Sequence, residues 1–288
     1  MSVSYPLIIT KKNLVAGSTN TYKYDFSSNV DMGNIDIGLG SASIWFSWRN
    51  ITAAKGNNQF SIIHPTTGTG NITLNLTLPD SGMNISDINN YIRYYLIYNG
   101  YYIQNTTTNE QIVYCKLQVN NSTYSCEFVS YPLPTSLPAG YTAGSAITFP
   151  STTRTPQLVV SQPNFGTVIG FATGTFPAVQ PIVLTTSTST LVPQVSDVTN
   201  VVLTLDSAMN PFSPNSKVIH SISPAGYAYA SLIKSEPNEI SWVPQQSGWR
   251  QSITIQLVNQ NLTPLEQFDT DLSIKLLLRY RDQISINR

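Results

Sequence analysis

Hydrophobic and polar residues alternate with a period of two along much of the chain, which is the pattern of half-buried β-strands. The alternation is clear at residues 71–78, where every second position is Ile or Leu, and at Tyr22, Tyr24 and Phe26. Gly, Pro and Asn separate most of the alternating segments and predict turns. Further strands are predicted over residues 43–49, 59–63, 113–119, 124–129, 199–205, 217–222, 239–243, 252–258 and 272–280.

This count of strands predicts an all-β protein, an antiparallel sandwich of jelly-roll type with one short helix and long loops or an inserted subdomain. Two alternating runs are expected on inner faces of the sandwich, because their apolar residues all point to one side of a strand. The first run is Ile72, Leu74, Leu76 and Leu78, and the second is Leu272, Ile274, Leu276 and Leu278.

One segment has helical instead of strand periodicity. Asn84 or Ser86 can serve as its N-cap, and Asn99-Gly100 provides a stop signal. Its apolar face is expected to pack on a sheet. The residues at helical spacing are Ile88, Tyr91, Ile92, Tyr95 and Leu96.

Two segments interrupt the strand pattern. Residues 131–163 contain too many prolines for central strands, so they are predicted to form a long connecting loop or a sheet edge. The Thr- and Ser-rich run 185–190 is predicted to be a second exposed connection. The expected organisation is one jelly-roll-based unit over 1–288, with its core from about 1–79 and 196–288 and with 80–195 as an insertion or elaboration.

Charge is scarce in this sequence. Only 10% of the 288 residues are charged, and 15 basic side chains balance 15 acidic ones, whereas a typical soluble domain has about 25% charged residues. A chain with no net charge lacks the basic field that a nucleic-acid backbone attracts, and copies of it repel each other little. We therefore expect self-association and no direct nucleic-acid contact. The sequence also has no apolar run near the ~20 residues that span a bilayer and no secretory signal pattern over 1–12, so no membrane span is expected.

The two cysteines, Cys115 and Cys126, flank a possible hairpin. If Asn120-Asn121 forms a two-residue turn, the two cysteines face each other across the two strands. The distance between their Cα atoms is then short enough for a disulfide. The alternative is a pair of small buried hydrophobic residues in a reducing compartment.

Catalytic and metal-binding patterns are missing. His64 and His220 have no nucleophile or metal ligand near them in sequence, so both are interpreted as structural and are expected to lie apart with no metal between them. Residues 165–170 include two glycines, but the third glycine and the helix of a phosphate-binding loop are not expected there, and a backbone turn explains them better.

Two carboxylate pairs raise the possibility of a glycosidase, because two acids suffice for that chemistry. Asp269 and Asp271 lie at the start of a predicted strand, and Glu236 and Glu239 flank Pro237 in a loop. Solvated turn residues are the favoured interpretation. We therefore predict no enzyme activity, no catalytic residues, no cofactor-binding residues and no metal ligands.

Several segments together resemble the penton, or vertex minor capsid protein, of virophages and Polinton-like viruses. Their order and spacing cover most of the chain and carry the resemblance better than any one segment. The segments are 44–52 (IWFSWRNIT), 78–82 (LPDSG), 86–92 (SDINNYI), 155–158 (TPQL), 165–171 (FGTVIGF), 201–204 (VVLT), 218–222 (VIHSI), 253–257 (ITIQL) and 272–279.

The resemblance implies a jelly-roll structural protein that forms homopentamers at the five-fold vertices of an icosahedral double-stranded DNA virus shell. It also implies double-jelly-roll major capsid protein as a neighbour, a vertex fibre or another minor capsid protein as a further partner, and the virion, assembled inside the host cell, as the location. A jelly-roll carbohydrate-binding or host-attachment module is the alternative. Tyr98, Tyr101 and Tyr102 beside Asn99 and Asn105 would supply its site.

Overall fold

The computed structural model describes residues 3–213 and 215–281 and divides the chain into two compact units. The split unit consists of residues 1–49 and 198–288, from the two ends of the chain, and the inserted unit consists of residues 50–197. Each unit has its own hydrophobic core. The two units are described separately below.

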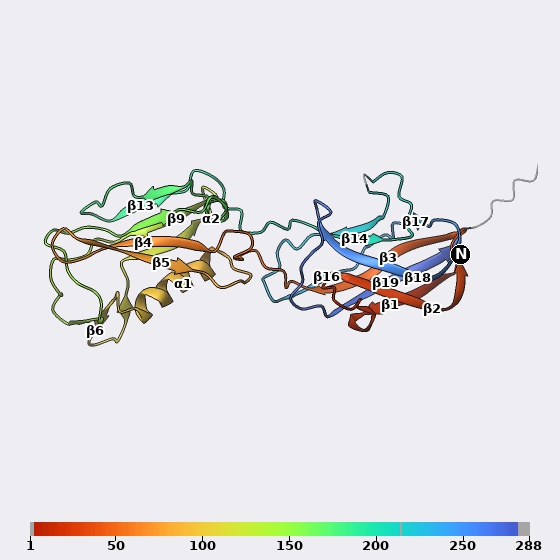
Figure 1. Cartoon of the computed structure of the whole chain (residues 1–288), viewed down its shortest axis with the longest axis horizontal. Helices are drawn as coiled ribbons and strands as arrows, with labels where there is room; N and C mark the ends of the chain where they lie inside the picture. The colour runs from red at the N-terminus through yellow and green to blue at the C-terminus, as the bar shows by residue number, and fades with distance from the viewer. Residues whose placement is uncertain (1–2, 214, 282–288) are drawn as a thin grey trace, which may run out of the picture. The chain divides into compact units, whose positions relative to one another are not determined.

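Two antiparallel sheets make up the split unit (Figure 1). The first sheet has the order β1-β19-β3-β16, with the short strand β17 also paired to β3, and the second has the order β15-β14-β18-β2. The short 3₁₀ helix η1 (Lys11–Asn13) follows β1. The strands are β1 (Ser4–Thr10), β2 (Thr21–Asp31), β3 (Ile35–Trp45), β14 (Val201–Leu205), β15 (Val218–Ile222), β16 (Leu232–Ser235), β17 (Val243–Pro244), β18 (Trp249–Asn259) and β19 (Leu272–Tyr280).

The strand order identifies the split unit as a jelly roll. Leaving out the two-residue β17, the described residues of the unit form eight strands. Numbering these strands along the chain gives one sheet in the order 1-8-3-6 and the other in the order 2-7-4-5. Four-stranded sheets that exchange strands in this way are two interleaved Greek keys. The inserted unit lies in the connection between the third and fourth strands. The predicted antiparallel jelly-roll sandwich is therefore confirmed, and of the two predicted alternatives, long loops or an inserted subdomain, the chain has an inserted unit.

The inner faces of the two sheets fill the core of the split unit. In β19, Leu272, Ile274 and Leu276 are buried and Leu278 is half-buried, while the alternate residues Ser273 and Lys275 are exposed, as the period of two requires. Tyr22 of β2 is completely buried and donates a hydrogen bond from its hydroxyl to the carbonyl of Thr270, 2.8 Å away. A buried hydroxyl with a partner avoids the cost of an unmet hydrogen bond.

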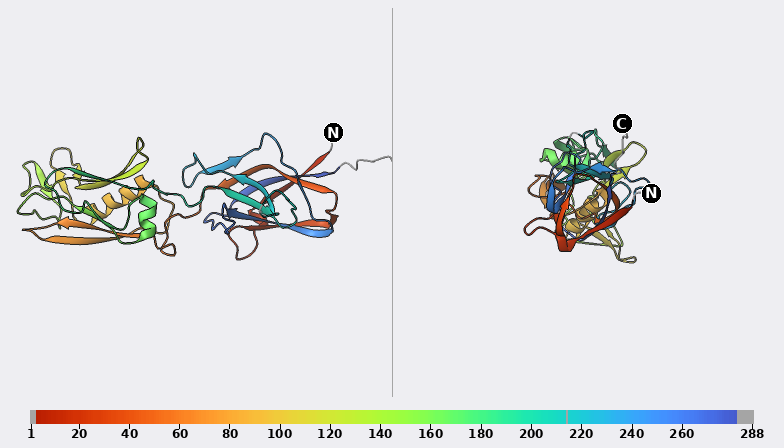
Figure 2. Two further views of the ribbon diagram at one scale, coloured as in Figure 1. Left: turned by 90° about the horizontal axis from the view of Figure 1, so that it is seen from above. Right: turned by 90° about the vertical axis from the view of Figure 1, so that its right-hand side faces the viewer.

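The inserted unit has three small antiparallel sheets and two helices. Its sheets have the orders β12-β11-β4-β5, β13-β9-β8 and β10-β6-β7. In the left view of Figure 2, α1 lies between the β4–β5 pair and the strands β8 and β9. The elements are β4 (Gln59–Pro65), β5 (Asn71–Thr77), α1 (Ile85–Tyr98), β6 (Ile103–Asn105), β7 (Gln111–Ile112), β8 (Cys115–Asn120), β9 (Ser125–Ser130), β10 (Tyr141–Ala143), β11 (Gln157–Val160), α2 (Pro163–Ile169), β12 (Gly174–Phe176) and β13 (Thr185–Thr188).

Local sequence signals account for α1. The side chain of Asn84 accepts a hydrogen bond from the backbone N–H of Asp87, and the Asp87 carboxylate accepts one from the backbone N–H of Asn84. This reciprocal capping box satisfies two N–H groups that would otherwise lack partners. The predicted N-cap, given as Asn84 or Ser86, is Asn84. The buried side of the helix consists of Ile85, Ile88, Ile92 and Leu96.

Three expectations about the inserted unit were wrong. A second helix, α2, forms where a turn was expected. It begins with Pro163 at its first turn and ends at Gly170, whose φ of 77° is left-handed. Inside the supposed proline-rich loop, β11 is a central strand that pairs with both β4 and β12. The run starting at Thr185 is not a free connection, because β13 pairs with β9.

The boundary between the units differs from the expected one at its first crossing. The chain leaves the split unit after Arg49, not near residue 79, and returns at Val198, close to the expected 196. Leu74, Leu76 and Leu78 are buried as expected, and Ile72 is exposed. Their core, however, is that of the inserted unit.

Candidate functional site

The residues with the greatest potential for chemistry are scattered over the two units. His64 lies in β4 of the inserted unit and His220 in β15 of the split unit. In the described parts of the chain, no group of three or more His, Cys, Asp or Glu side chains is arranged to hold a metal ion. No described helix is long and apolar enough to cross a membrane.

His64 is a buried residue of the core. Its Nδ1 donates a hydrogen bond to the carbonyl oxygen of Pro65, 2.9 Å away, and its ring packs against Tyr101 with 5.2 Å between the centroids. Burial lowers the pKa of this imidazole to about 4, because a charged ring would lose its hydration. Burial also lowers the pKa of His220. A neutral, enclosed imidazole suits packing better than proton transfer with a substrate.

The two carboxylate pairs occupy exposed connections, as turn residues do. The Asp269 carboxylate accepts a hydrogen bond from the backbone N–H of Asp271, and the Asp269 backbone N–H donates to the hydroxyl of Ser47. Glu236 and Glu239 are exposed after β16. An Asp whose oxygen closes its own turn contributes to the conformation of the loop.

The cysteine hairpin has a different register from the expected one. Cys126 lies opposite Val119, and Cys115 lies opposite Ser130. The connection after Asn120 contains four residues instead of two, and Tyr124 adopts a left-handed φ of 49°. Both cysteines are free and buried, so the interpretation as two small core residues is correct and the cross-strand disulfide is wrong.

The tyrosines proposed for a carbohydrate site do not share one surface. Tyr101 is buried against His64, whereas Tyr98 projects from the end of α1 with 76% of its surface exposed. Tyr98 instead stacks on Tyr94, with ring centroids 5.7 Å apart. The rings of Tyr94 and Tyr98 are both exposed.

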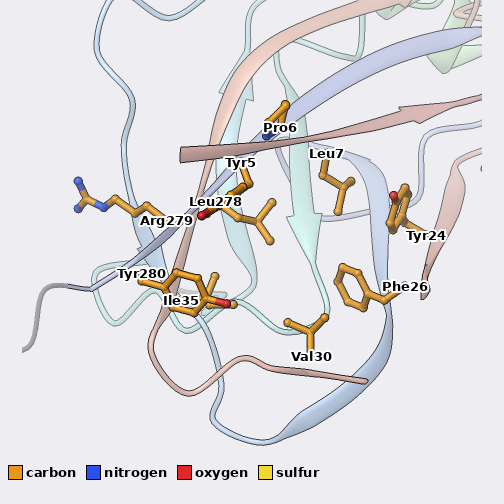
Figure 3. A pocket seen from close by; sticks show the side chains of 10 residues that line it. All are labelled: Tyr5, Pro6, Leu7, Tyr24, Phe26, Val30, Ile35, Leu278, Arg279 and Tyr280. Atoms are coloured by element: carbon orange, nitrogen blue, oxygen red, sulfur yellow. The ribbon is translucent and has the colours of Figure 1, made fainter. Parts of the chain in front are cut away.

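An apolar hollow with a volume of about 320 Å³ lies at one edge of the jelly roll. We call it the edge hollow. It opens where the edge strand of one sheet, β1, and the edge strand of the other, β2, separate from each other. Figure 3 shows its lining side chains, which come from β1, β2, β19 and the first residue of β3. They are Tyr5, Pro6, Leu7, Tyr24, Phe26, Val30, Ile35, Leu278, Arg279 and Tyr280.

Aromatic rings dominate the edge hollow. Tyr24 and Phe26 meet edge to face with 5.7 Å between centroids, and Tyr5 and Tyr280 meet edge to face at 6.5 Å. Both Tyr5 and Tyr280 remain more than half exposed. Rings that combine an apolar body with a polar tip are enriched at protein interfaces.

Arg279 is the single charged residue that lines the edge hollow, and it is paired with Asp36. The guanidinium lies 3.4 Å from the carboxylate of Asp36, which is 8% exposed and also lies 3.1 Å from the side chain of Arg281. Its other neighbour is the ring of Trp242, 4.2 Å below the guanidinium carbon. Figure 3 shows the side chain pointing away from the hollow. The edge hollow can therefore accept a neutral apolar group without burying an unpaired charge.

Comparison with known proteins gives structural similarity alone. No family model and no curated protein sequence matches the chain. The mavirus penton protein has a similar structure, with 9% sequence identity, a TM-score of 0.46 and coverage of 97% of this chain and 99% of that one. A chain in the structure of the Sputnik virophage is similar at 10% identity and a TM-score of 0.42, covering 97% of this chain and 98% of that one.

These structures come from the group that the sequence segments resemble, so the predicted resemblance to virophage penton proteins is confirmed as a resemblance. The strand order defines the class of fold as a jelly-roll protein with a unit inserted between its third and fourth strands.

Proposed function

We propose that this chain is a structural protein of an icosahedral virus shell and forms a homopentamer at the five-fold vertices. The observation that carries the proposal is the jelly-roll strand order, 1-8-3-6 against 2-7-4-5, in a chain with little charge. Jelly rolls are common in viral capsid proteins but also occur in lectins and cupins. The fold by itself therefore does not distinguish a capsid protein from these other classes. The sequence segments that resemble penton proteins favour the capsid class.

The surfaces of the split unit fit repeated assembly better than catalysis. The edge hollow is apolar and open, and its aromatic rim is exposed. His64 is buried against Tyr101, and the Asp269 carboxylate accepts a hydrogen bond within its own turn. When two copies with few surface charges come into contact, few charged side chains lose their hydration, so the desolvation cost is small. These features support a structural, self-associating role.

Neighbours in the shell are part of the proposal. A pentamer at a vertex would border double-jelly-roll major capsid proteins, and a vertex fibre or another minor capsid protein would be a further partner. The expected location is the vertex of the virion after assembly inside the host cell. No nucleic-acid contact is included, because the chain has no net positive charge.

Electron microscopy of the purified chain tests the proposal. Averaged images are expected to show rings with five-fold symmetry, and addition of the major capsid protein is expected to produce larger assemblies with the rings at their corners. Rings of another symmetry would contradict the vertex assignment. Particles of single-chain size at all concentrations would contradict self-association altogether.

A second candidate is attachment to a neutral glycan through the inserted unit. The stacked and exposed rings of Tyr94 and Tyr98 on α1 favour it, because sugar faces pack on aromatic rings. Glycan-array binding that is lost in Tyr98→Ala would support this candidate. Binding that is unchanged by the substitution, or no binding, would remove it.

A further inference from the structure

An exposed phenylalanine projects from the connection between β14 and β15. Phe212 has 97% of its surface exposed, the largest exposed fraction among the large hydrophobic residues of the described chain. Full exposure of an aromatic side chain gives the monomer no packing energy, since apolar burial is the source of that energy. Aromatic residues, Phe among them, are enriched in the buried cores of protein interfaces.

One asparagine, Asn210, hydrogen-bonds the backbone of the connection near Phe212. The backbone N–H of Asn210 donates a hydrogen bond to the carbonyl of Ser216 (2.7 Å), and its side-chain amide donates to the carbonyl of Val218 (3.1 Å). The Asn210 side-chain oxygen accepts the backbone N–H of Phe212 at 3.1 Å. These bonds hold the backbone at Asn210 and Phe212, which lowers the entropy lost on binding.

Phe212 and the edge hollow lie on opposite flanks of the jelly roll. The edge strands on the flank of the hollow are β1 and β2, whereas those of the other flank are β16 and β15, and the Phe212 connection leads into β15. Along the strands, both features belong to the same end. Leu205, the last residue of β14, pairs with Ile255 of β18. Two residues before Ile255, Ile253 pairs with Tyr24, which lines the edge hollow. The Phe212 connection therefore begins at the end of the sheet where the hollow lies.

We propose that Phe212 of one copy of this chain inserts into the edge hollow of the next copy. We call Phe212 the knob. Because the knob and the edge hollow lie on opposite flanks, the contact between copies is head to tail, and such contacts close into rings when the rotation between copies allows it. The residues from Ser207 to Ser213 include no charged side chain, and Arg279 of the hollow is paired with Asp36. The contact therefore buries no unpaired charge on either side. It rests on the proposed function and names the lateral contact of the ring.

Two single-cysteine additions test the contact between copies. One variant is Ser213→Cys, which keeps the neighbouring Phe212, and the other is Tyr5→Cys, at the rim of the hollow. The two are mixed under native conditions and treated with a short bifunctional maleimide. The native Cys115 and Cys126 are buried, so they do not compete. A cross-linked product that contains one chain of each kind, and that neither variant gives when treated alone, is expected.

Substitution of the knob provides the second measurement. Phe212→Ala is expected to weaken association by at least about tenfold, as loss of a central aromatic anchor does. Phe268→Ala is the matched control, because Phe268 is also exposed but lies before β19, away from the Phe212 connection. The control should leave association unchanged, whereas loss of the contact between the Phe268 ring and Arg49, 4.7 Å away, should lower the unfolding midpoint slightly.

The outcomes separate this inference from the function on which it rests. If wild-type rings form but the mixed variants give no cross-link and Phe212→Ala associates normally, the knob contact is wrong and the ring-forming function stands. If the wild-type chain forms no ring, the proposed function fails and the knob contact fails with it.

Discussion

The rings of Phe60 and Phe165 are stacked in the core of the inserted unit, with centroids 4.6 Å apart and planes within 3° of parallel. Phe60 belongs to β4 and Phe165 to α2, so the stack attaches the short helix to the sheet. Both side chains are almost completely buried. A seven-residue helix gains little from its own hydrogen bonds, so this packing is what keeps α2 in place.

Phe165→Ala is expected to destabilise the inserted unit by about 3–5 kcal/mol, because it removes a buried ring and leaves a cavity. Hydrogen exchange of the β4 and α2 amides measures the loss. All four tryptophans of the chain belong to the split unit, so their fluorescence reports on that unit and serves as an internal reference. Unchanged protection of the α2 amides would contradict the role of the stack.

Arg154 fixes the turn between β4 and β5. Its guanidinium donates hydrogen bonds to the carbonyl of Gly70 (2.8 Å), the carbonyl of Thr69 (3.1 Å) and the side-chain oxygen of Gln180 (3.0 Å). Arg154→Lys keeps the charge but cannot reproduce the planar arrangement of donors. We expect it to cost about 1–3 kcal/mol of unfolding free energy and to speed exchange of the Gly70 amide. Arg93→Lys, at an exposed helix position with one carbonyl partner, is the control and should have little effect.

Acidification is expected to destabilise the chain through His64. Its pKa is about 4 in the folded protein and near the ordinary 6.5 when unfolded, so the unfolded state binds more protons between these values. Stability is therefore complete above about pH 6.5 and falls as the pH drops toward 4, by up to about 3 kcal/mol from this residue. Urea unfolding at several pH values measures the slope. His64→Gln should flatten it, and an unchanged slope in that variant would assign the effect to other groups.

The buried thiols are expected to be inert. Burial raises the pKa of Cys115 and of Cys126 to about 12, so neither forms the reactive thiolate near neutral pH. A thiol reagent should label no cysteine in the native protein and both in urea. Fast labelling of the native chain, or a protein that lacks free thiols after purification, would contradict the described hairpin.

Periodicity was sufficient to predict the fold class and the main helix. The alternating Leu272, Ile274 and Leu276 do line the jelly-roll core, and Asn84 caps α1. Periodicity could not assign strands to one of two cores, because the strands β4 and β5 alternate in the same way as those of the split unit. That is why the first boundary lies at residue 49 and not near 79.

Other differences arise from tertiary contacts and from turn chemistry. Asn120 closes its turn through its own side chain, which accepts the backbone N–H of Ser122, and this lengthens the hairpin connection and shifts the cysteines. In α2, Gly166 lies so close to the carbonyl of Phe171 that no Cβ fits. That glycine was interpreted as a turn signal, although Pro163 and Gly170 marked the two ends of a helix. The edge hollow escaped prediction because it forms from strands at both ends of the sequence.

The salt dependence of association follows from the apolar lateral contact. Few charges would be desolvated, and the paired Arg279 and Asp36 lie within one copy. Association should therefore change little, or strengthen slightly, as salt rises from about 0.05 to about 0.5 M. A ring held by ion pairs between copies would weaken over the same range, and this result would contradict the proposed contact.

Native mass measurement of the purified chain over a range of protein concentrations tests the central claim most directly. The account predicts a species of five times the 31.7 kDa chain mass that persists at low and at high salt. A monomer at every concentration, or a stable dimer or trimer in its place, would contradict the proposal that this jelly-roll protein forms the vertices of a virus shell.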